Sequence, residues 1–143
     1  MKFQLIIIKY FIMKEAIQIA ANTNYYGLTN KADYHGKLKN KNCGDEIKIE
    51  FDIKKNCISN FRYEGEMCIY CQASASLIAN TKINLHEQNL KKMHKQIYDF
   101  FDDKIKFKIF IIKKFSLIIK KKNYTRKECI ALPINAILKI ISK

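Results

Sequence analysis

Residues 46–64 read EIKIEFDIKKNCISNFRYE, and this stretch decides the fold. Apolar residues occupy positions 47, 49, 51 and 53, and charged residues occupy positions 48, 50 and 52. This alternation is typical of a strand with one buried face and one wet face. Residues 54–56 (KKN) supply a polar turn, after which residues 57–64 can return as a second strand. The stretch therefore predicts an antiparallel hairpin.

Helical patterns lie on both sides of the hairpin. Residues 13–22 (MKEAIQIAAN) are rich in alanine, and residues 72–79 are rich in small side chains. Near the C-terminus, positions 134, 137, 138 and 141 are apolar, which is the spacing of one helical face. We expect helices in all three segments, the last starting near Ile130, because Pro133 is tolerated in a first turn. Residues 22–42 are predicted as a connection.

The region between these helices is harder to assign. Asn84 followed by Glu87 has the spacing of a helix N-cap and its capping box. Residues 97–119 alternate between apolar and basic side chains, a period that fits a strand or a helix. We favour a helix there, packed on the core rather than lying on a membrane.

Length and cysteine usage bound the class of protein. With 143 residues, the chain is expected to form a single domain over residues 1–143, with residues 1–12 as a non-core N-terminal extension. Lys9 interrupts the apolar run at residues 3–8, far short of the ~20 residues of a membrane span. Five dispersed cysteines do not suggest a disulfide framework. We expect a cytoplasmic protein with free thiols.

The formal net charge is +14, and lysine dominates over arginine. A nucleic-acid-binding surface concentrates basic residues on one face and often adds arginine or aromatic platforms. The lysines of this chain are dispersed along the whole sequence. A basic nucleic-acid-binding module is therefore kept only as a distant alternative, and no nucleic-acid partner is expected.

Three cysteines stand in chemically suggestive contexts. Cys43 precedes Gly44 and Asp45, so a glycine turn can aim a thiolate and a carboxylate at one place. Cys68 and Cys129 each open a predicted helix, where the helix dipole favours thiolate. Soft thiolates that converge select zinc, copper(I) or iron–sulfur clusters.

Two further cysteines have contexts that point less clearly to a chemical role. Cys71 forms a C-x-x-C pair with Cys68, which suits zinc or redox chemistry, but it can equally be a buried apolar residue or a supporting one. Cys57 lies in the predicted second strand and is expected to pack. The histidines show no metal-binding spacing with the cysteines, and His86 and His94 are expected in solvent.

These motifs, CGD before an alternating strand, then GEMCIYCQASAS, then RKECIALP before a terminal helix, resemble the NifU/IscU-type iron–sulfur scaffold domains. The resemblance runs from about Asn22 to the C-terminus. It implies an α+β fold, with a small antiparallel β-sheet packed against several α-helices. It also implies that Cys43, Cys68 and Cys129 bind a nascent cluster, of the [2Fe–2S] type, and that Asp45 tunes its lability or binds zinc.

By the same resemblance the protein is a non-enzymatic assembly scaffold. We expect a monomer or weak dimer. It would receive sulfur from a cysteine desulfurase and pass the cluster to apo iron–sulfur acceptor proteins. Glu128 stands before the last cysteine, where IscU proteins have histidine, and RKEC is more similar to the SufU branch. An alternative is therefore a zinc-bound sulfur acceptor, a sulfurtransferase in a broad sense. Cys71 departs from both branches and is kept as an additional metal candidate.

Overall fold

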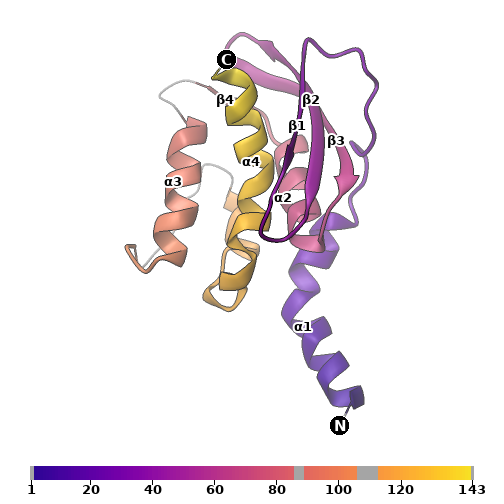
Figure 1. Cartoon of the computed structure of the whole chain (residues 1–143), viewed down its shortest axis with the longest axis vertical. Coiled ribbons are helices and arrows are strands. Elements are labelled where there is room, and N and C mark those ends of the chain that lie inside the picture. Colours follow the sequence, from indigo (N-terminus) through magenta and orange to yellow (C-terminus); the bar gives the residue numbers. More distant parts are fainter. Residues whose placement is uncertain (1, 86–88, 106–112, 143) are drawn as a thin grey trace.

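The computed structural model describes residues 2–85, 89–105 and 113–142. It is an α+β protein in which helices pack on a four-stranded antiparallel sheet, as expected (Figure 1). In chain order the elements are α1 (Lys2–Ala20), β1 (Tyr34–Lys39), β2 (Glu46–Lys54), β3 (Cys57–Glu66), α2 (Ile69–Ala79), β4 (Ile83–Asn84), α3 (Asn89–Phe101), the 3₁₀ helices η2 (Lys113–Leu117) and η3 (Lys121–Arg126), and α4 (Lys127–Ile141).

The predicted hairpin is confirmed as β2 and β3. The strands pair antiparallel up to Lys54 and Cys57, and the sheet order is β1-β2-β3-β4. Lys55 and Asn56 form the turn with φ values of 51° and 59°. Two consecutive positive φ angles match the right-handed twist of the flanking strands, which makes this turn suited to a tight hairpin.

The core lies between one face of the sheet and the helices. Ile47, Ile49 and Phe51 of β2 are fully buried on this face. Helix α4 packs against β1 and β2, α2 packs against β3 and α4, and α3 lies on the far side of α4 (Figure 1). A Cβ on Gly36 of β1 would lie 2.9 Å from the Ile140 side chain, so α4 crosses this strand closely.

The N-terminal third differs from the sequence-based expectation in two ways. The helix predicted over residues 13–22 begins at Lys2 and ends at Ala20. Its second half is anchored by buried Ala16 and Ala20, whereas Phe3 is 76% exposed. The segment 22–42, predicted as a connection, contains strand β1, which pairs with β2 over residues 34–39. As an edge strand whose residues are exposed or half-buried, β1 has little apolar pattern to reveal it.

The middle of the chain also corrects two predictions. Asn84 is not a helix N-cap but pairs with Cys57 in the short strand β4, and α3 begins at Asn89. The helix favoured over residues 97–119 ends at Phe101, and Asp103 turns the chain with φ 61°. Residues 106–112 lie outside the described residues, and the chain continues in the 3₁₀ helix η2.

The terminal helix is confirmed, but it begins at Lys127, before Ile130, and Pro133 lies inside it. Proline has no amide hydrogen to donate to the carbonyl four residues earlier, which here belongs to Cys129. A helix able to cross a membrane is not found within residues 2–85, 89–105 and 113–142.

Candidate metal centre

The loop between β1 and β2 carries the first two candidate residues. The Asn40 amide donates to the Asp45 carbonyl and the Gly44 amide donates to the Asn40 carbonyl, both at 2.8 Å, which closes a tight turn. Gly44 has φ +78°, a conformation that side-chain-bearing residues rarely adopt. The turn leaves Cys43 exposed and folds Asp45 inward, with 8% of its surface accessible.

Cys68 is the N-cap of α2, with extended backbone angles of φ −68° and ψ 166°. Its backbone amide donates to Asp45 Oδ2 at 3.1 Å, which ties the start of α2 to the CGD loop. Strand β3 leads to the start of α2 through Gly65, where φ is +144°. A Cβ there would lie 2.2 Å from the Glu46 carbonyl oxygen, so the strand reaches α2 along a path that only glycine allows.

Cys129 lies in the first turn of α4 and is 1% exposed. Its position depends on how α4 packs on α2. Ser74, which is fully buried in α2, donates from Oγ to the Ile130 carbonyl at 2.7 Å. Because this carbonyl belongs to the first turn of α4, the bond fixes the helix end that carries Cys129 relative to the helix that Cys68 caps.

The four predicted residues converge. The ligand atoms of Cys43, Asp45 and Cys129 all lie within 4.8 Å of one another. Cys68 contacts this group through its side-chain interactions with Cys129 and Asp45. The structure thus brings together thiols and a carboxylate from a loop and two helix ends, which the sequence separates by up to 86 positions (129 minus 43).

Cys71 is placed differently from these four residues. It is fully buried in α2 and lies outside the group of Cys43, Asp45 and Cys129. Its backbone amide donates to the Cys68 side chain. Burial, together with the negative charge of Cys68 nearby, raises the pKa of the Cys71 thiol well above its usual value. The resting Cys71 thiol is therefore protonated more readily than the thiol of Cys68.

The thiols of Cys68 and Cys129 share one hydrogen bond with opposite effects. The bond from Cys129 lowers the pKa of Cys68, although burial opposes this. The same bond, followed by burial, raises the pKa of Cys129. Cys68 is therefore the first of this pair to become a thiolate, and a thiolate is the form that binds metal or attacks sulfur.

The donor set fits a thiophilic metal. Three thiols and one carboxylate can provide four ligands, the number that zinc takes in tetrahedral sites. Zinc–sulfur bonds of about 2.3 Å place neighbouring ligands of a tetrahedron roughly 3.7 Å apart. The separations of up to 4.8 Å among Cys43, Asp45 and Cys129 are within about 1 Å of that requirement.

Several predicted or overlooked residues lie elsewhere. Glu128 turns away from the cysteines and accepts a hydrogen bond from Tyr98 at 2.7 Å. His94, expected in solvent, is half-buried with its ring 4.8 Å from that of Tyr98, and burial lowers its pKa. His86 lies outside the described residues. Cys57 is half-buried at the start of β3. Sequence reasoning missed Ser74, whose only signal was its place among small residues.

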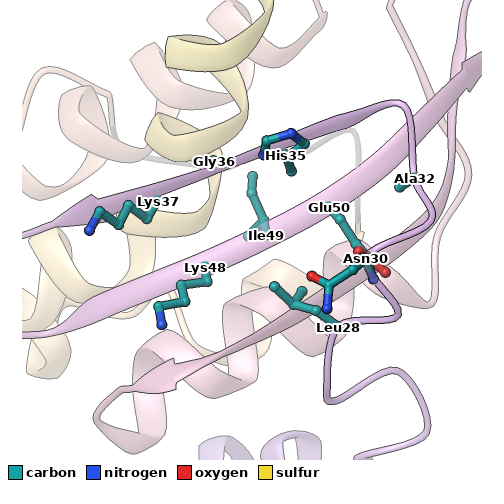
Figure 2. Close-up of a pocket in the computed structure, with 9 residues that line it drawn as sticks. All are labelled: Leu28, Asn30, Ala32, His35, Gly36, Lys37, Lys48, Ile49 and Glu50. Carbon is teal, nitrogen blue, oxygen red and sulfur yellow. Dashed lines mark hydrogen bonds between the residues drawn. The ribbon is translucent and has the colours of Figure 1, made fainter.

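A cavity of about 320 Å³ lies on the sheet, away from these cysteines (Figure 2). All of its lining residues come from the loop before β1 and from strands β1 and β2: Leu28, Asn30, Ala32, His35, Gly36, Lys37, Lys48, Ile49 and Glu50. Within it, Glu50 is 2% exposed and its carboxylate accepts bonds from the amides of Thr29 and Asn30. The carboxylate is thus occupied in holding this loop on the sheet.

Comparison with known proteins places the chain in a family. The model for the NifU-like N terminal domain matches residues 12–109, which include Cys43, Asp45 and Cys68 and end before Cys129. The iron–sulfur cluster assembly scaffold protein IscU of Thermotoga maritima is 35% identical over 65 residues, 45% of this chain. That alignment spans only 46% of the relative's length.

Solved structures show the same fold. A nitrogen-fixing NifU-like protein (N-terminal) from Brucella abortus aligns with a TM-score of 0.77 and 18% identity, covering 90% of each chain. A candidate iron–sulfur cluster assembly scaffold for the SUF system from Fervidobacterium islandicum aligns with a TM-score of 0.74 and 20% identity, covering 92% of this chain and 98% of that one. Since the family model also matches well over half of the sequence, the chain belongs to the family of NifU-like N-terminal domains.

Proposed function

We propose that this protein is an iron–sulfur cluster assembly scaffold, which builds a nascent cluster as its cargo and transfers it to apo-proteins. The observation that carries the proposal is the convergence of Cys43, Asp45 and Cys129 within 4.8 Å, with Cys68 in contact. The family membership and the name of the Thermotoga maritima relative support the same function. In this proposal the protein is a non-enzymatic cytoplasmic monomer or weak dimer.

Each residue has a distinct role in the proposal. Cys43, Cys68 and Cys129 bind the cluster, of the [2Fe–2S] type, through sulfur, the ligand that iron–sulfur clusters prefer. Asp45 provides a harder oxygen ligand, which holds iron less firmly than a thiolate and so favours release to an acceptor. Because Cys43 lies on an exposed glycine turn, its sulfur can move away from the other ligands without unfolding either helix.

Sulfur would arrive as a persulfide from a cysteine desulfurase. A sulfur donor must reach an accessible thiol, and the accessibilities of these cysteines differ. Cys43 is exposed and Cys68 is partly exposed, whereas Cys129 is buried. We therefore assign sulfur acceptance to Cys43 and Cys68, with Cys129 completing the ligand set from the interior.

The test is metal and acid-labile sulfide analysis of protein purified without oxygen. The protein is analysed before and after incubation with a cysteine desulfurase, iron and cysteine. Iron and sulfide in near-equal amounts are expected for the native chain and are lost in Cys43→Ala, Cys68→Ala and Cys129→Ala. Cys57→Ala is the matched control, because Cys57 lies in β3, outside the candidate centre. Absence of both metal and sulfide from the native chain contradicts the proposal.

A second candidate function keeps the residues but changes the metal. The compact arrangement of Cys43, Asp45 and Cys129 favours a single ion, and three thiolates with one carboxylate suit zinc. In this alternative, zinc is held by the four residues and one cysteine leaves it to accept sulfur from the desulfurase. Tightly bound zinc, with no iron or sulfide after the same incubation, distinguishes this sulfur acceptor from the scaffold.

A further inference from the structure

Cys68 and Cys71 form a dithiol at the beginning of α2. Cys68 is the N-cap, with an extended backbone, and Cys71 lies one turn into the helix. Cys68 is partly exposed, while Cys71 is fully buried beneath it. The Cys71 amide donates to the Cys68 side chain, so the Cys68 sulfur is held over the first turn of α2, the turn that contains Cys71.

This arrangement allows a disulfide without rebuilding the fold. Helix geometry places Cα atoms three residues apart at about 5 Å. Disulfides join Cα atoms that are usually about 4.4–6.8 Å apart. The extended backbone of Cys68 precedes the first helical residue, so its side chain can rotate without breaking a helical hydrogen bond. An accessible cysteine followed by a buried one at a helix N-terminus is the layout of C-x-x-C redox sites.

We propose that Cys71 is a resolving cysteine, which cleaves a persulfide on Cys68 and releases its outer sulfur as sulfide. The inference rests on the proposed function, in which Cys68 accepts sulfur. It adds an activity that a cluster requires, because a cluster contains sulfide, whereas a persulfide carries sulfur two electrons more oxidised.

The step balances within the protein. The Cys71 sulfur attacks Sγ of Cys68, forming the Cys68–Cys71 disulfide, while the bond between Sγ and the outer sulfur breaks. The outer sulfur leaves with the electron pair of that bond as hydrosulfide and takes the proton that Cys71 gives up. The two cysteine sulfurs are oxidised together by two electrons, and the outer sulfur is reduced by two. An external dithiol then reduces the disulfide and becomes a disulfide itself.

Burial suits Cys71 to this role. A sulfur donor cannot reach a fully buried thiol, so Cys71 does not itself collect sulfur. In the proposed function Cys43 and Cys129 serve as ligands, in the compact group with Asp45. Cys129 also contacts Cys68, which makes it the competing resolver that the experiment has to distinguish.

The experiment follows sulfur on metal-free protein treated with glutathione persulfide, without any desulfurase. Native chain, Cys71→Ala and Cys129→Ala are compared by mass spectrometry of alkylated peptides and by assay of released sulfide. In the native chain we expect sulfide release, together with a Cys68–Cys71 disulfide. In Cys71→Ala the Cys68 persulfide should last longer by roughly tenfold or more, because an intramolecular thiol is lost. Cys129→Ala should still form the Cys68–Cys71 disulfide and release sulfide, although Cys68 loses the hydrogen bond that lowers its pKa and so accepts sulfur more slowly. Cys57→Ala, in β3, should behave like the native chain.

Each outcome decides the inference. A Cys68 persulfide of equal lifetime in the native chain and in Cys71→Ala overturns the inference alone, and sulfur acceptance stands. A disulfide that maps to Cys68 and Cys129 overturns it in favour of the other resolver. No persulfide on Cys68 in any variant, with no sulfide released, overturns both the inference and sulfur acceptance at this residue. Circular dichroism and zinc binding, which needs no sulfide, check that Cys71→Ala is folded and still binds metal.

Discussion

Gly65 is a position where one added methyl group should strongly lower the stability of the fold. It pairs with Ile47 in the β2–β3 ladder, three residues before Cys68. A Cβ at this position would lie 2.2 Å from the Glu46 carbonyl oxygen, 3.1 Å from the Glu46 carbonyl carbon and 3.2 Å from Ile47 Cα. All three atoms belong to the backbone of the neighbouring strand, so no side chain can rotate away to make room.

The destabilisation has two parts. The φ angle of +144° is strained for alanine, which costs about 1–3 kcal/mol. Relieving the clash requires the strands to separate by roughly 1 Å, which weakens ladder hydrogen bonds worth about 0.5–1.5 kcal/mol each. We expect Gly65→Ala to lower the free energy of unfolding by about 3–5 kcal/mol, a large part of the total for a domain of this size.

Gly27→Ala is the matched control. Gly27 also has a positive φ, +95°, but a Cβ there would meet nothing within 4 Å. Its cost is backbone strain alone, about 1–3 kcal/mol, without the added cost of separating the strands. Urea unfolding followed by circular dichroism measures both variants against the native chain. Equal destabilisation of the two variants would refute the steric argument, and with it the claim that only glycine can lead β3 to Cys68.

Three further predictions follow from the contacts. Ser74→Ala should cost about 1–3 kcal/mol in urea unfolding, because the buried Ile130 carbonyl loses its side-chain donor. Burial raises the pKa of Glu50, but the hydrogen bonds from Thr29 and Asn30 outweigh burial and lower the pKa from its ordinary value. The ionised Glu50 carboxylate therefore stabilises the fold above about pH 4.5, and this contribution is lost as pH falls through the lowered pKa of Glu50. Glu50→Gln should make the free energy of unfolding less dependent on pH in that acidic range. In zinc-loaded protein, Asp45→Ala should speed zinc loss to a chelator by about tenfold, or about 1.4 kcal/mol, because one of four ligands is lost. An unchanged rate would remove Asp45 from the ligand set.

Sequence patterns predicted the elements whose burial is periodic. The β2–β3 hairpin was readable because residues 47, 49 and 51 are apolar and buried. The predicted wet face is wrong at Glu50, which is buried under the loop that its carboxylate binds. Helix α4 was readable because residues 134, 137, 138 and 141 are apolar at helical spacing. In the structure its first half is buried on every side, over residues 129–134. Strand β1 was missed because the exposed edge of a sheet needs few apolar side chains, and its pairing with β2 is made by the backbone.

Other errors came from local signals that tertiary contacts override. The Asn84 side chain is of a type that often caps helices, but its segment forms a short strand that pairs with β3 at Cys57. The alternation at residues 97–119 did not reveal that α3 ends at Phe101, where the chain turns at Asp103. Capping and periodicity are weak local preferences, and tertiary contacts such as pairing with a sheet edge override them.

The sequence by itself determined the residue types of the candidate centre and their local settings: a cysteine and an aspartate on a glycine turn, and two cysteines at helix starts. Only the tertiary structure decided that these residues lie close together. The approach of Cys129 to Cys43 and Asp45 depends on α4 packing on α2 and the sheet, including the bond from Ser74. Spacing along a chain fixes neighbours within a helix or strand, whereas distances between distant segments are set by the packing of the core that lies between them.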